Sequence, residues 1–586
     1  MRRPVLLGIG ALGSLVGGAL LPLRAQDTTP PAPAVRPALA GNRGPYEVAF
    51  TPDGTLALVT EYDEGALAVI ERATGRVLRH IPTGGTQPTG VAVTPDGALA
   101  LVTNSFSGSL AFIDLKTGKT ETLPLRGMPW DVVITPDGKR AFVSVSQLDH
   151  VAVLELATRK ITATLPTGHR PQALALTPDG STLVAANLTA GTVSYFDTES
   201  LAARGTAKVP SVNLRGVAAF PDGRRVFAVG QRAQNERPTE TPIGIWSNQA
   251  FVQAPGGPRN GIENLWLDLM GTDVSDPDSV VLDARQELAY VTCSGGNSVN
   301  VVPVDGEGET RTVSEIGAHP RGLAFTPNKK EIWVANLLGN DLAVLDPVTL
   351  QILRRVSLGP TARKDPQLLG RYLFASAKIV KGEQFSCNSC HPDGGTDGIS
   401  WKFVHVPDAL GKQTDRNAKA LRGNLAGSAP YRWSGHEPTI QHFVEGELKG
   451  LLQTPMVTEA EKAALIDYVG AIPEPPNPYR NPDGTHTPAA LRGKLLFEGK
   501  AACATCHAGP RFGGQRQAWI GTTPEGVFLQ VPRLKGVYDT APYLHNGKAA
   551  TLEEVFSQQN ANNLHGKIEL LSVEERVDLL HYVREL

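Results

Sequence analysis

Residues 48–60 read VAFTPDGTLALVT, in which a Thr-Pro-Asp-Gly phrase separates two short apolar stretches. Proline presets φ, aspartate can bond the backbone ahead of it, and glycine tolerates positive φ, so the phrase is typical of a turn between strands. Two more apolar stretches follow, joined by the turn-like Ala73-Thr74-Gly75. The repeat therefore predicts four consecutive strands at Val48–Phe50, Leu56–Thr60, Ala66–Ile70 and Val77–Ile81.

The same phrase returns along the first 330 residues, with departures from the motif in its later copies. Its copies start at Thr51, Thr94, Thr135, Thr177, Phe220, Leu282 and Thr326. Consecutive copies lie 41–44 residues apart, except for one gap of 62 residues. This period is that of a β-propeller with one four-stranded blade per repeat. The sequence thus predicts an all-β, seven-bladed propeller over residues 41–360. The repeats resemble the YVTN-type propeller repeats, as in Tyr290-Val291-Thr292-Cys293.

The long gap contains the segment Gln231–Asp278, which is rich in proline, glycine and large apolar residues. Long loops inside a regular array are usually functional. One hypothesis is that this segment covers a propeller face and packs against the C-terminal third of the chain. The alternative is a surface loop without such a role.

The N-terminus reads as a secretory signal. Arg2 and Arg3 precede the apolar stretch Val5–Leu21, and a small residue, Ala25, suits cleavage. We therefore expect a signal peptide at 1–25, a Pro/Ala-rich linker at 26–40, and a periplasmic or otherwise exported protein. An uncleaved membrane anchor is the alternative. No later segment is long and apolar enough to span, so no membrane span is expected in the mature chain.

The overall composition is that of globular material. The chain has 586 residues, which is enough for two or three domains. Hydrophobic residues make up 41% and charged residues 19%. The net charge of -2 gives no reason to expect a nucleic acid as partner.

Four of the five cysteines lie in two C-x-x-C-H motifs. Two thiols at this spacing reach the vinyl groups of one porphyrin, and the adjacent histidine reaches its iron. A zinc site or a redox C-x-x-C is the alternative, but the histidine at the same offset in both copies favours haem. We expect two covalently bound haem c groups, with attachment through Cys387, Cys390, Cys503 and Cys506 and iron ligation by His391 and His507. The fifth cysteine, Cys293, is expected to be a small buried thiol.

The sequence around the two motifs is duplicated. Gly370–Phe374 before the first motif matches Gly493–Phe497 before the second, and Ala429–Gly435 matches Ala541–Gly547. Each half ends in a helix with a capping box, Thr458–Ile472 and Ser572–Leu586. A mainly α-helical di-haem region is therefore predicted, with one cytochrome c unit at 361–475 and a second at 476–586.

This region resembles the bacterial di-haem cytochrome c peroxidase family, which includes the enzyme that matures the quinone cofactor of methylamine dehydrogenase. The match covers about residues 361–586. It rests on the paired C-x-x-C-H motifs, Gly394–Gly398, the Pro-Tyr-x-Trp-x-Gly phrase ending at Gly435, and Ala541–Leu552.

The resemblance implies an oxidoreductase with a division of labour. The haem at His507 would receive electrons from a small redox donor protein, a cytochrome or a cupredoxin. The haem at His391 would meet hydrogen peroxide, and Trp433 would relay electrons between the haems. A calcium ion between the haem units is also implied.

The second axial ligands are less determined by the sequence. By resemblance, His405 in the loop after the first motif would be the distal ligand of the first haem and take part in catalysis; an ordinary loop histidine is the alternative. The family's Met or Tyr ligand for the second haem falls near Gln559 here, which is a poor iron ligand. The remaining candidates are His565 and Met456, or a five-coordinate iron.

Two functions remain open at this stage. The first is a peroxidase-like enzyme whose propeller docks or shapes a substrate, which could be a protein. Its acid–base group would follow Trp433, where Glu445, Glu447 and Gln453 could not be aligned with the family. The second is a non-catalytic electron-transfer cytochrome with two closed irons and the propeller as a partner-binding platform.

Overall fold

The structure is a computed structural model. It describes residues 41–223, 225–236, 241–253, 263–267, 273–283, 287–402, 415–455, 457–514, 516–560 and 562–586. The signal peptide and linker predicted at 1–25 and 26–40 lie outside these ranges, as do His405 and Met456. Those predictions therefore stay predictions.

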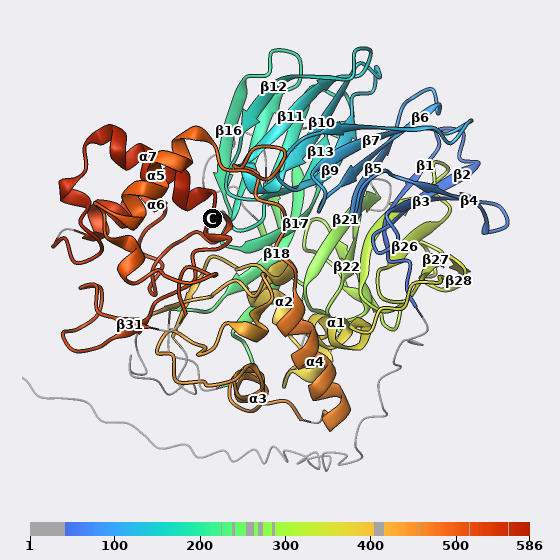
Figure 1. The fold of residues 1–586 in the computed structure, drawn as a ribbon. Helices are drawn as coiled ribbons and strands as arrows, with labels where there is room; N and C mark the ends of the chain where they lie inside the picture. Colours follow the sequence, from blue (N-terminus) through green and yellow to red (C-terminus); the bar gives the residue numbers. More distant parts are fainter. Residues whose placement is uncertain are drawn as a thin grey trace, which may run out of the picture. The chain divides into compact units, whose positions relative to one another are not determined.

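Residues 45–357 form seven four-stranded antiparallel sheets, each built from consecutive strands (Figure 1). The first strands of neighbouring blades contact one another in a ring, from β1 through β5 to β25 and back to β1. The predicted seven-bladed propeller is therefore confirmed, and its innermost strands are the first of each blade. The YVTN type of the repeats stays a prediction.

The strands of the first four blades are listed here in chain order. Blade one has β1 (Pro45–Phe50), β2 (Leu56–Glu61), β3 (Ala66–Glu71) and β4 (Arg76–Pro82). Blade two has β5 (Pro88–Val93), β6 (Leu99–Asn104), β7 (Ser109–Asp114) and β8 (Thr120–Pro124). Blade three has β9 (Pro129–Ile134), β10 (Arg140–Val145), β11 (His150–Glu155) and β12 (Lys160–Pro166). Blade four has β13 (Pro171–Leu176), β14 (Thr182–Asn187), β15 (Thr192–Asp197) and β16 (Ala203–Lys208).

The last three blades continue the pattern. Blade five has β17 (Val212–Ala219), β18 (Val226–Ala233), β19 (Trp246–Gln253) and β20 (Glu263–Trp266). Blade six has β21 (Pro277–Asp283), β22 (Leu288–Cys293), β23 (Ser298–Pro303) and β24 (Arg311–Val313). Blade seven has β25 (Pro320–Phe325), β26 (Ile332–Asn336), β27 (Asp341–Leu345) and β28 (Ile352–Ser357). Cys293 is fully buried here, as expected.

The Thr-Pro-Asp-Gly phrase joins the first two strands of a blade. The Thr51 hydroxyl donates to the Asp53 carboxylate at 2.6 Å and accepts from the backbone N–H of Leu56 at 3.1 Å. Asp53 in turn accepts from the backbone N–H of Thr55 at 3.0 Å, and Gly54 has a φ of 68°. Each residue of the phrase therefore has a structural role in the turn.

The long segment Gln231–Asp278 is not only a loop. It contains β19 and β20, the two outer strands of blade five, so the irregular spacing reflects longer connections within that blade. Its described part also contacts the C-terminal third: the Asn248 amide donates to the carbonyl of Gln384 at 3.0 Å. This supports the predicted contact with the C-terminal third.

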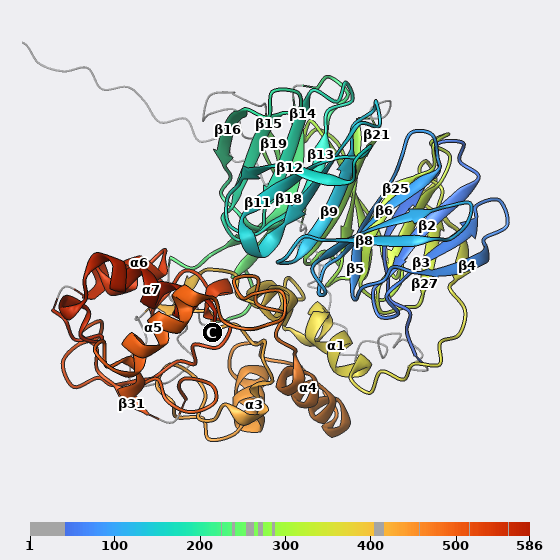
Figure 2. The same cartoon turned by 45° about the horizontal axis from the view of Figure 1, so that its top comes forward.

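The C-terminal third is helical, as predicted (Figure 2). Its helices are α1 (Leu368–Ala375), α2 (Cys387–Cys390), α3 (Ile440–Lys449), α4 (Glu459–Ala471), α5 (Pro488–Glu498), α6 (Leu552–Phe556) and α7 (Val573–Arg584). Two small hairpins pair β29 (Ser400–Trp401) with β30 (Arg416–Asn417), and β31 (Gln517–Ala518) with β32 (Leu529–Gln530). Short 3-10 helices include η3 (Pro392–Gly394) and η5 (Cys503–Thr505).

The predicted duplication is visible in the helix packing. α1 packs on α4, and α5 packs on α7. A Cβ atom at Gly370 would lie 2.1 Å from the carbonyl oxygen of Ala464, and one at Gly493 would lie 2.0 Å from that of Asp578. The two aligned glycines thus allow the same close helix–helix approach in both halves. Both predicted capping boxes are present, at Thr458 and Ser572.

The two halves differ in how they are buried. One hydrophobic core contains Leu368 and Phe374 of the first half together with Tyr46, Trp130 and Trp246 of the propeller. The core of the second half consists of residues 490–586 alone. The first half therefore shares a core with the propeller. Among the described residues, none of the helices reaches the length and apolarity of a membrane span.

Candidate functional site

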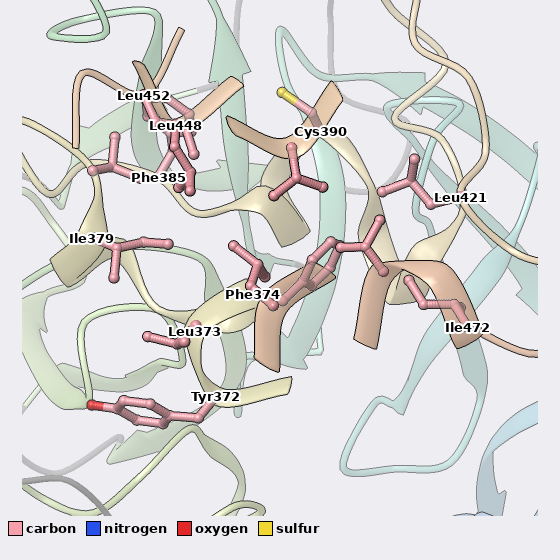
Figure 3. Close-up of a cluster of buried hydrophobic side chains, with 14 of the residues drawn as sticks. Tyr372, Leu373, Phe374, Ile379, Phe385, Cys390, Leu421, Leu448, Leu452 and Ile472 are labelled. Atoms are coloured by element: carbon pink, nitrogen blue, oxygen red, sulfur yellow. The ribbon is translucent and has the colours of Figure 1, made fainter. Parts of the chain in front are cut away.

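The first C-x-x-C-H motif forms α2 and the residue that follows it. Ser386 is the N-cap of α2 and accepts from the backbone N–H of Asn388 at 3.1 Å. Cys390 is buried in the core shared with the propeller, beside Phe385 and Leu421 (Figure 3). Burial lowers the pKa of His391 to about 4, so its imidazole is neutral, the form that binds metals.

His391 carries an unsatisfied polar atom. Its Nδ1 is buried and has no hydrogen-bond partner among the described residues. The backbone of Gly395 and of Lys419 lies close to this imidazole and raises its pKa, which offsets part of the effect of burial.

The second motif forms η5 and a histidine with a fixed tautomer. The Nδ1 of His507 donates to the carbonyl oxygen of Phe512 at 3.0 Å. This hydrogen bond leaves Nε2 without a proton and available to a metal, which is the usual arrangement of a metal-binding histidine. His507 is 8% exposed.

His565 faces His507. Their ring centroids lie 6.2 Å apart, and their planes are tilted by 37°. Burial, together with the nearby His507, lowers the pKa of His565 to about 4, so this ring is neutral too. At this spacing His507 and His565 would together hold the iron of a haem at the second motif.

A cavity of about 550 Å³ reaches both motifs. Its lining includes Cys390 and His391 of the first motif and Cys506 of the second. This volume is in the range of cofactor sites, about 300–1,000 Å³. The cavity reaches both motifs, and burial lowers the pKa of His391 and of His507, so that both imidazoles are neutral; the residues present therefore fit haem c at both motifs. Among the described residues, no cluster of three or more His, Cys, Asp or Glu side chains suits a further metal ion, and the calcium prediction stays untested.

Trp433 lies where the two halves meet. Its ring is edge-on to that of His545, the residue that occupies the same position in the duplicated phrase. The backbone N–H of Asn417 donates to the carbonyl of His545 at 2.6 Å, and the backbone N–H of Gln530 donates to the carbonyl of Trp433 at 2.8 Å. Asn417 and Gln530 are the last residues of β30 and β32. Each half therefore binds the other through equivalent atoms.

Trp433 is held by its own half as well. The indole Nε1 donates to the carbonyl of Asn417 at 2.9 Å. The Lys419 ammonium lies 4.2 Å from the centre of the indole ring, and burial, with Arg533 nearby, lowers the pKa of Lys419 to about 7. The ring is therefore fixed in orientation at the wall of the cavity.

Of the three acid–base candidates, only Glu447 lines the cavity. Its carboxylate pairs with Arg432 at 2.7 Å, and Arg432 also pairs with Glu437. Glu445 instead accepts from Gln441 one turn earlier on α3. The structure therefore distinguishes Glu447 from the other two acid–base candidates, which the sequence alone does not.

Several residues that the sequence analysis did not single out belong to the same region. They are His545, whose buried Nδ1 has no hydrogen-bond partner in the described part of the chain, Asp276, which accepts from Ser386 before α2, and Asp393, two residues after the first motif. In the alignment of Ala429–Gly435 with Ala541–Gly547, His545 occupies the position of Trp433. The duplication in the sequence is therefore a signal from which His545 could have been predicted. No sequence pattern predicts the partners of the Asp276 and Asp393 carboxylates. His405 and Met456 lie outside the described residues.

The chain is similar in sequence to several known proteins. A family profile of RoxA-like, cytochrome c-like proteins matches residues 529–564. Hydrazine synthase subunit gamma of Kuenenia stuttgartiensis is 26% identical over 37% of this chain and 76% of its own length. The cytochrome c551 peroxidase of Nitrosomonas europaea is 25% identical over 32% of this chain and 70% of its own length. Methylamine utilization protein MauG of Methylorubrum extorquens is 23% identical over 32% of this chain and 66% of its own length.

The chain is homologous to these di-haem cytochromes. This homology implies haem c as a cofactor. Among solved structures, Kuenenia stuttgartiensis hydrazine synthase matches with a TM-score of 0.49 and 22% identity, covering 53% of this chain and 97% of the matched chain.

Proposed function

We propose that the protein is an exported, peroxidase-like oxidoreductase with two haem c groups. Electrons would enter at the haem of the second motif from a small donor protein, a cytochrome or a cupredoxin, and pass to a reactive haem at the first motif. The homology to cytochrome c peroxidases and the two motifs that share one cavity support this proposal. A calcium ion between the haem units remains part of it.

The observation that carries the proposal is the difference between the two histidines. His507 lies beside a second imidazole, His565, with ring centroids 6.2 Å apart, and the two rings would hold the iron of the second haem. His391 lines the open cavity together with Glu447 and Arg432. A closed iron suits electron transfer and an open one suits binding of a substrate, so the second haem would transfer electrons and the first would react.

The haem groups supply one-electron redox chemistry and, at an open iron, a place for hydrogen peroxide. The chain's own residues would do the rest. Glu447 would accept and return a proton, because it is the acidic side chain that reaches the cavity from α3. Arg432 holds that carboxylate in place through their ion pair. Trp433, fixed by Asn417, would conduct electrons between the two halves.

The propeller would act as the docking platform for a protein substrate or a redox partner. Blade five connects this platform to the helical region. Its strand β19 carries Trp246, which packs on Trp401 with ring centroids 5.1 Å apart. This contact joins the propeller to the wall of the haem cavity, since Trp401 lines it.

The test is a spectroscopic titration of the purified holoprotein. Absorption and EPR spectra are recorded in the oxidised and half-reduced states, with and without hydrogen peroxide. One low-spin haem and one high-spin haem, with peroxide-dependent oxidation of a reduced donor cytochrome, are expected. Two low-spin haems that are inert to peroxide at every level of reduction would instead support the non-catalytic electron-transfer cytochrome.

A further inference from the structure

Two arginines of the propeller hold Asp393, the second residue after the first motif. The Asp393 carboxylate lies 3.2 Å from the guanidinium of Arg215 and 3.3 Å from that of Arg321. The arginine side chains are only 4% and 3% exposed, and they project from the innermost strands β17 and β25. Asp393 is two residues beyond His391, in η3. Charges of blades five and seven are thus fixed beside the first motif.

The propeller also holds α2 from its N-terminal side. The Asp276 carboxylate accepts from the Ser386 hydroxyl at 2.7 Å and from the Ser389 hydroxyl. The amide of Asn213 donates to the carbonyl of Ser389 at 2.7 Å. Ser389 lies between Cys387 and Cys390, so these bonds fix the turn that carries both thiols.

The second motif has a different environment. The described polar partners of residues 503–507 come from residues 501, 502, 512 and 516 of its own half. Its core is also its own, whereas Cys390 is buried in a core that includes Trp130 and Trp246 of the propeller. The propeller therefore contacts one motif and not the other, within the part of the chain that the structure describes.

We infer that Arg215, Arg321 and Asp276 are positioning residues for the first haem, through which the propeller sets the coordination and reduction potential of that haem alone. The inference rests on the proposed di-haem function and adds to it a role for the propeller at the reactive site. A partner that shifts blades five to seven would then act on the first haem without contacting it.

The sign of the effect follows from the charges. A nearby positive charge disfavours the oxidised iron, which carries one more positive charge than the reduced iron. Replacing Arg321 with a neutral residue therefore stabilises the oxidised first haem and lowers its midpoint potential. Burial strengthens the interaction, because the medium around Arg321 has a lower dielectric constant than water.

The test compares four variants of the holoprotein: Arg321→Gln, Arg321→Lys, Arg215→Gln and, as a control, Arg354→Gln. Arg354 also forms an ion pair within the propeller, at 2.8 Å from Glu331, but contacts blade residues only. Each haem is followed separately by potentiometric titration with EPR and absorption detection. Haem content by mass and circular dichroism establish that each variant is folded and loaded.

In Arg321→Gln and Arg215→Gln, the ratio of reduced to oxidised first haem at a fixed potential is expected to fall about tenfold, ~59 mV for a one-electron couple. The second haem should keep its midpoint potential in every variant. Arg321→Lys keeps the positive charge, so its first haem should stay close to the wild-type midpoint potential. Arg354→Gln should match the wild type. If Arg321→Gln fails to fold, Arg215→Gln provides the same test because it leaves the Arg321–Asp278 pair intact.

Two failures can be told apart. If the wild-type protein carries fewer than two haems by mass, the proposed function is wrong. If both haems are present and neither glutamine variant moves the potential or the EPR signature of the first haem, the proposed function stands and the role assigned to the propeller arginines is overturned.

Discussion

The indole ring of Trp433 lies edge-on to the imidazole ring of His545, with ring centroids 6.3 Å apart and planes at 74°. The duplication aligns these two residues, so equivalent positions of the two halves meet at their interface. The reciprocal backbone bonds from Asn417 and Gln530 hold the two rings in register. The contact is therefore a shared structural element of both halves, and it lies beside the cavity that reaches both motifs.

Replacing Trp433 with phenylalanine tests its role as a relay. Phenylalanine keeps an aromatic ring at the interface but is much harder to oxidise, and it loses the bond to Asn417. Electron transfer between the haems is expected to slow by about tenfold or more, equivalent to ~1.4 kcal/mol of barrier. Flash reduction followed by time-resolved absorption of the two haems measures the rate of electron transfer. Trp519→Phe is the matched control, since Trp519 bonds only within its loop, to Thr523; equal rates in both variants would exclude the relay.

Replacing His565 with alanine tests whether this ring closes the second iron. Because His565 is the imidazole that faces His507, its loss should convert a low-spin haem to a high-spin one while the first haem keeps its signals. EPR of the oxidised protein measures the spin state. His581→Ala, on the exposed face of α7, should change neither haem. A low-spin second haem in His565→Ala would show that another residue is the ligand.

Replacing Glu447 with glutamine tests the acid–base role. Glutamine keeps the size of the side chain but cannot take up a proton, so turnover of peroxide should fall by about 10²–10⁴-fold. The haem spectra should stay those of the wild type. Glu445→Gln, two residues earlier on α3 and bonded to Gln441, should retain activity. Comparable losses in both variants would point to α3 as a whole and argue against a specific role for Glu447.

Replacing the cysteines in pairs tests the number of haems. Cys387→Ala with Cys390→Ala should remove one covalently bound haem, and Cys503→Ala with Cys506→Ala should remove the other. Mass spectrometry of the denatured chains counts the haems directly. Cys293→Ala should keep both, because Cys293 is fully buried in the propeller. A variant pair that loses no haem would show that its motif binds something else.

Replacing Gly493 with alanine tests the close packing of α5 on α7. The added Cβ would lie 2.0 Å from the carbonyl oxygen of Asp578, so the backbone must shift. The cost is expected to be about 1–3 kcal/mol of unfolding free energy. Denaturant titration with detection at the second haem measures it. Leu495→Ala, on the exposed side of the same helix, should change stability by about 0.5 kcal/mol or less.

The fold was predictable because its signals are local. The Thr-Pro-Asp-Gly turns repeat at nearly constant spacing, and each is stabilised by contacts within five residues, such as Thr51 with Leu56. The capping boxes at Thr458 and Ser572 are likewise local. The seven blades and the helical C-terminal region follow from these patterns. The strand ends differ by a few residues, because pairing extends beyond the apolar positions that the pattern shows.

The site was predictable only where a motif has fixed spacing. The two C-x-x-C-H motifs carry their own geometry, so their histidines could be named. The partners described above for Asp276 and Asp393 lie 72 to 178 residues away in sequence, and only the closed ring of blades brings them together. Glu447 could not be separated from Glu445 for a similar reason: which of them reaches the cavity depends on how α3 packs.

The propeller and the first half of the helical region share a core. This core limits where recombination between genes of related proteins can exchange one part of the chain and keep the rest folded. A break at residue 360 would expose Leu368 and Phe374 on one side and Trp130 on the other. Each large apolar side chain that returns to water costs about 1.5–3 kcal/mol. Residues 490–586 keep their own core, so an exchange that replaces only the last hundred residues leaves the apolar cores of both products intact and breaks polar contacts such as the Arg422–Asp539 pair. The propeller and the first C-x-x-C-H motif are therefore expected to be inherited together, while the second motif can be exchanged.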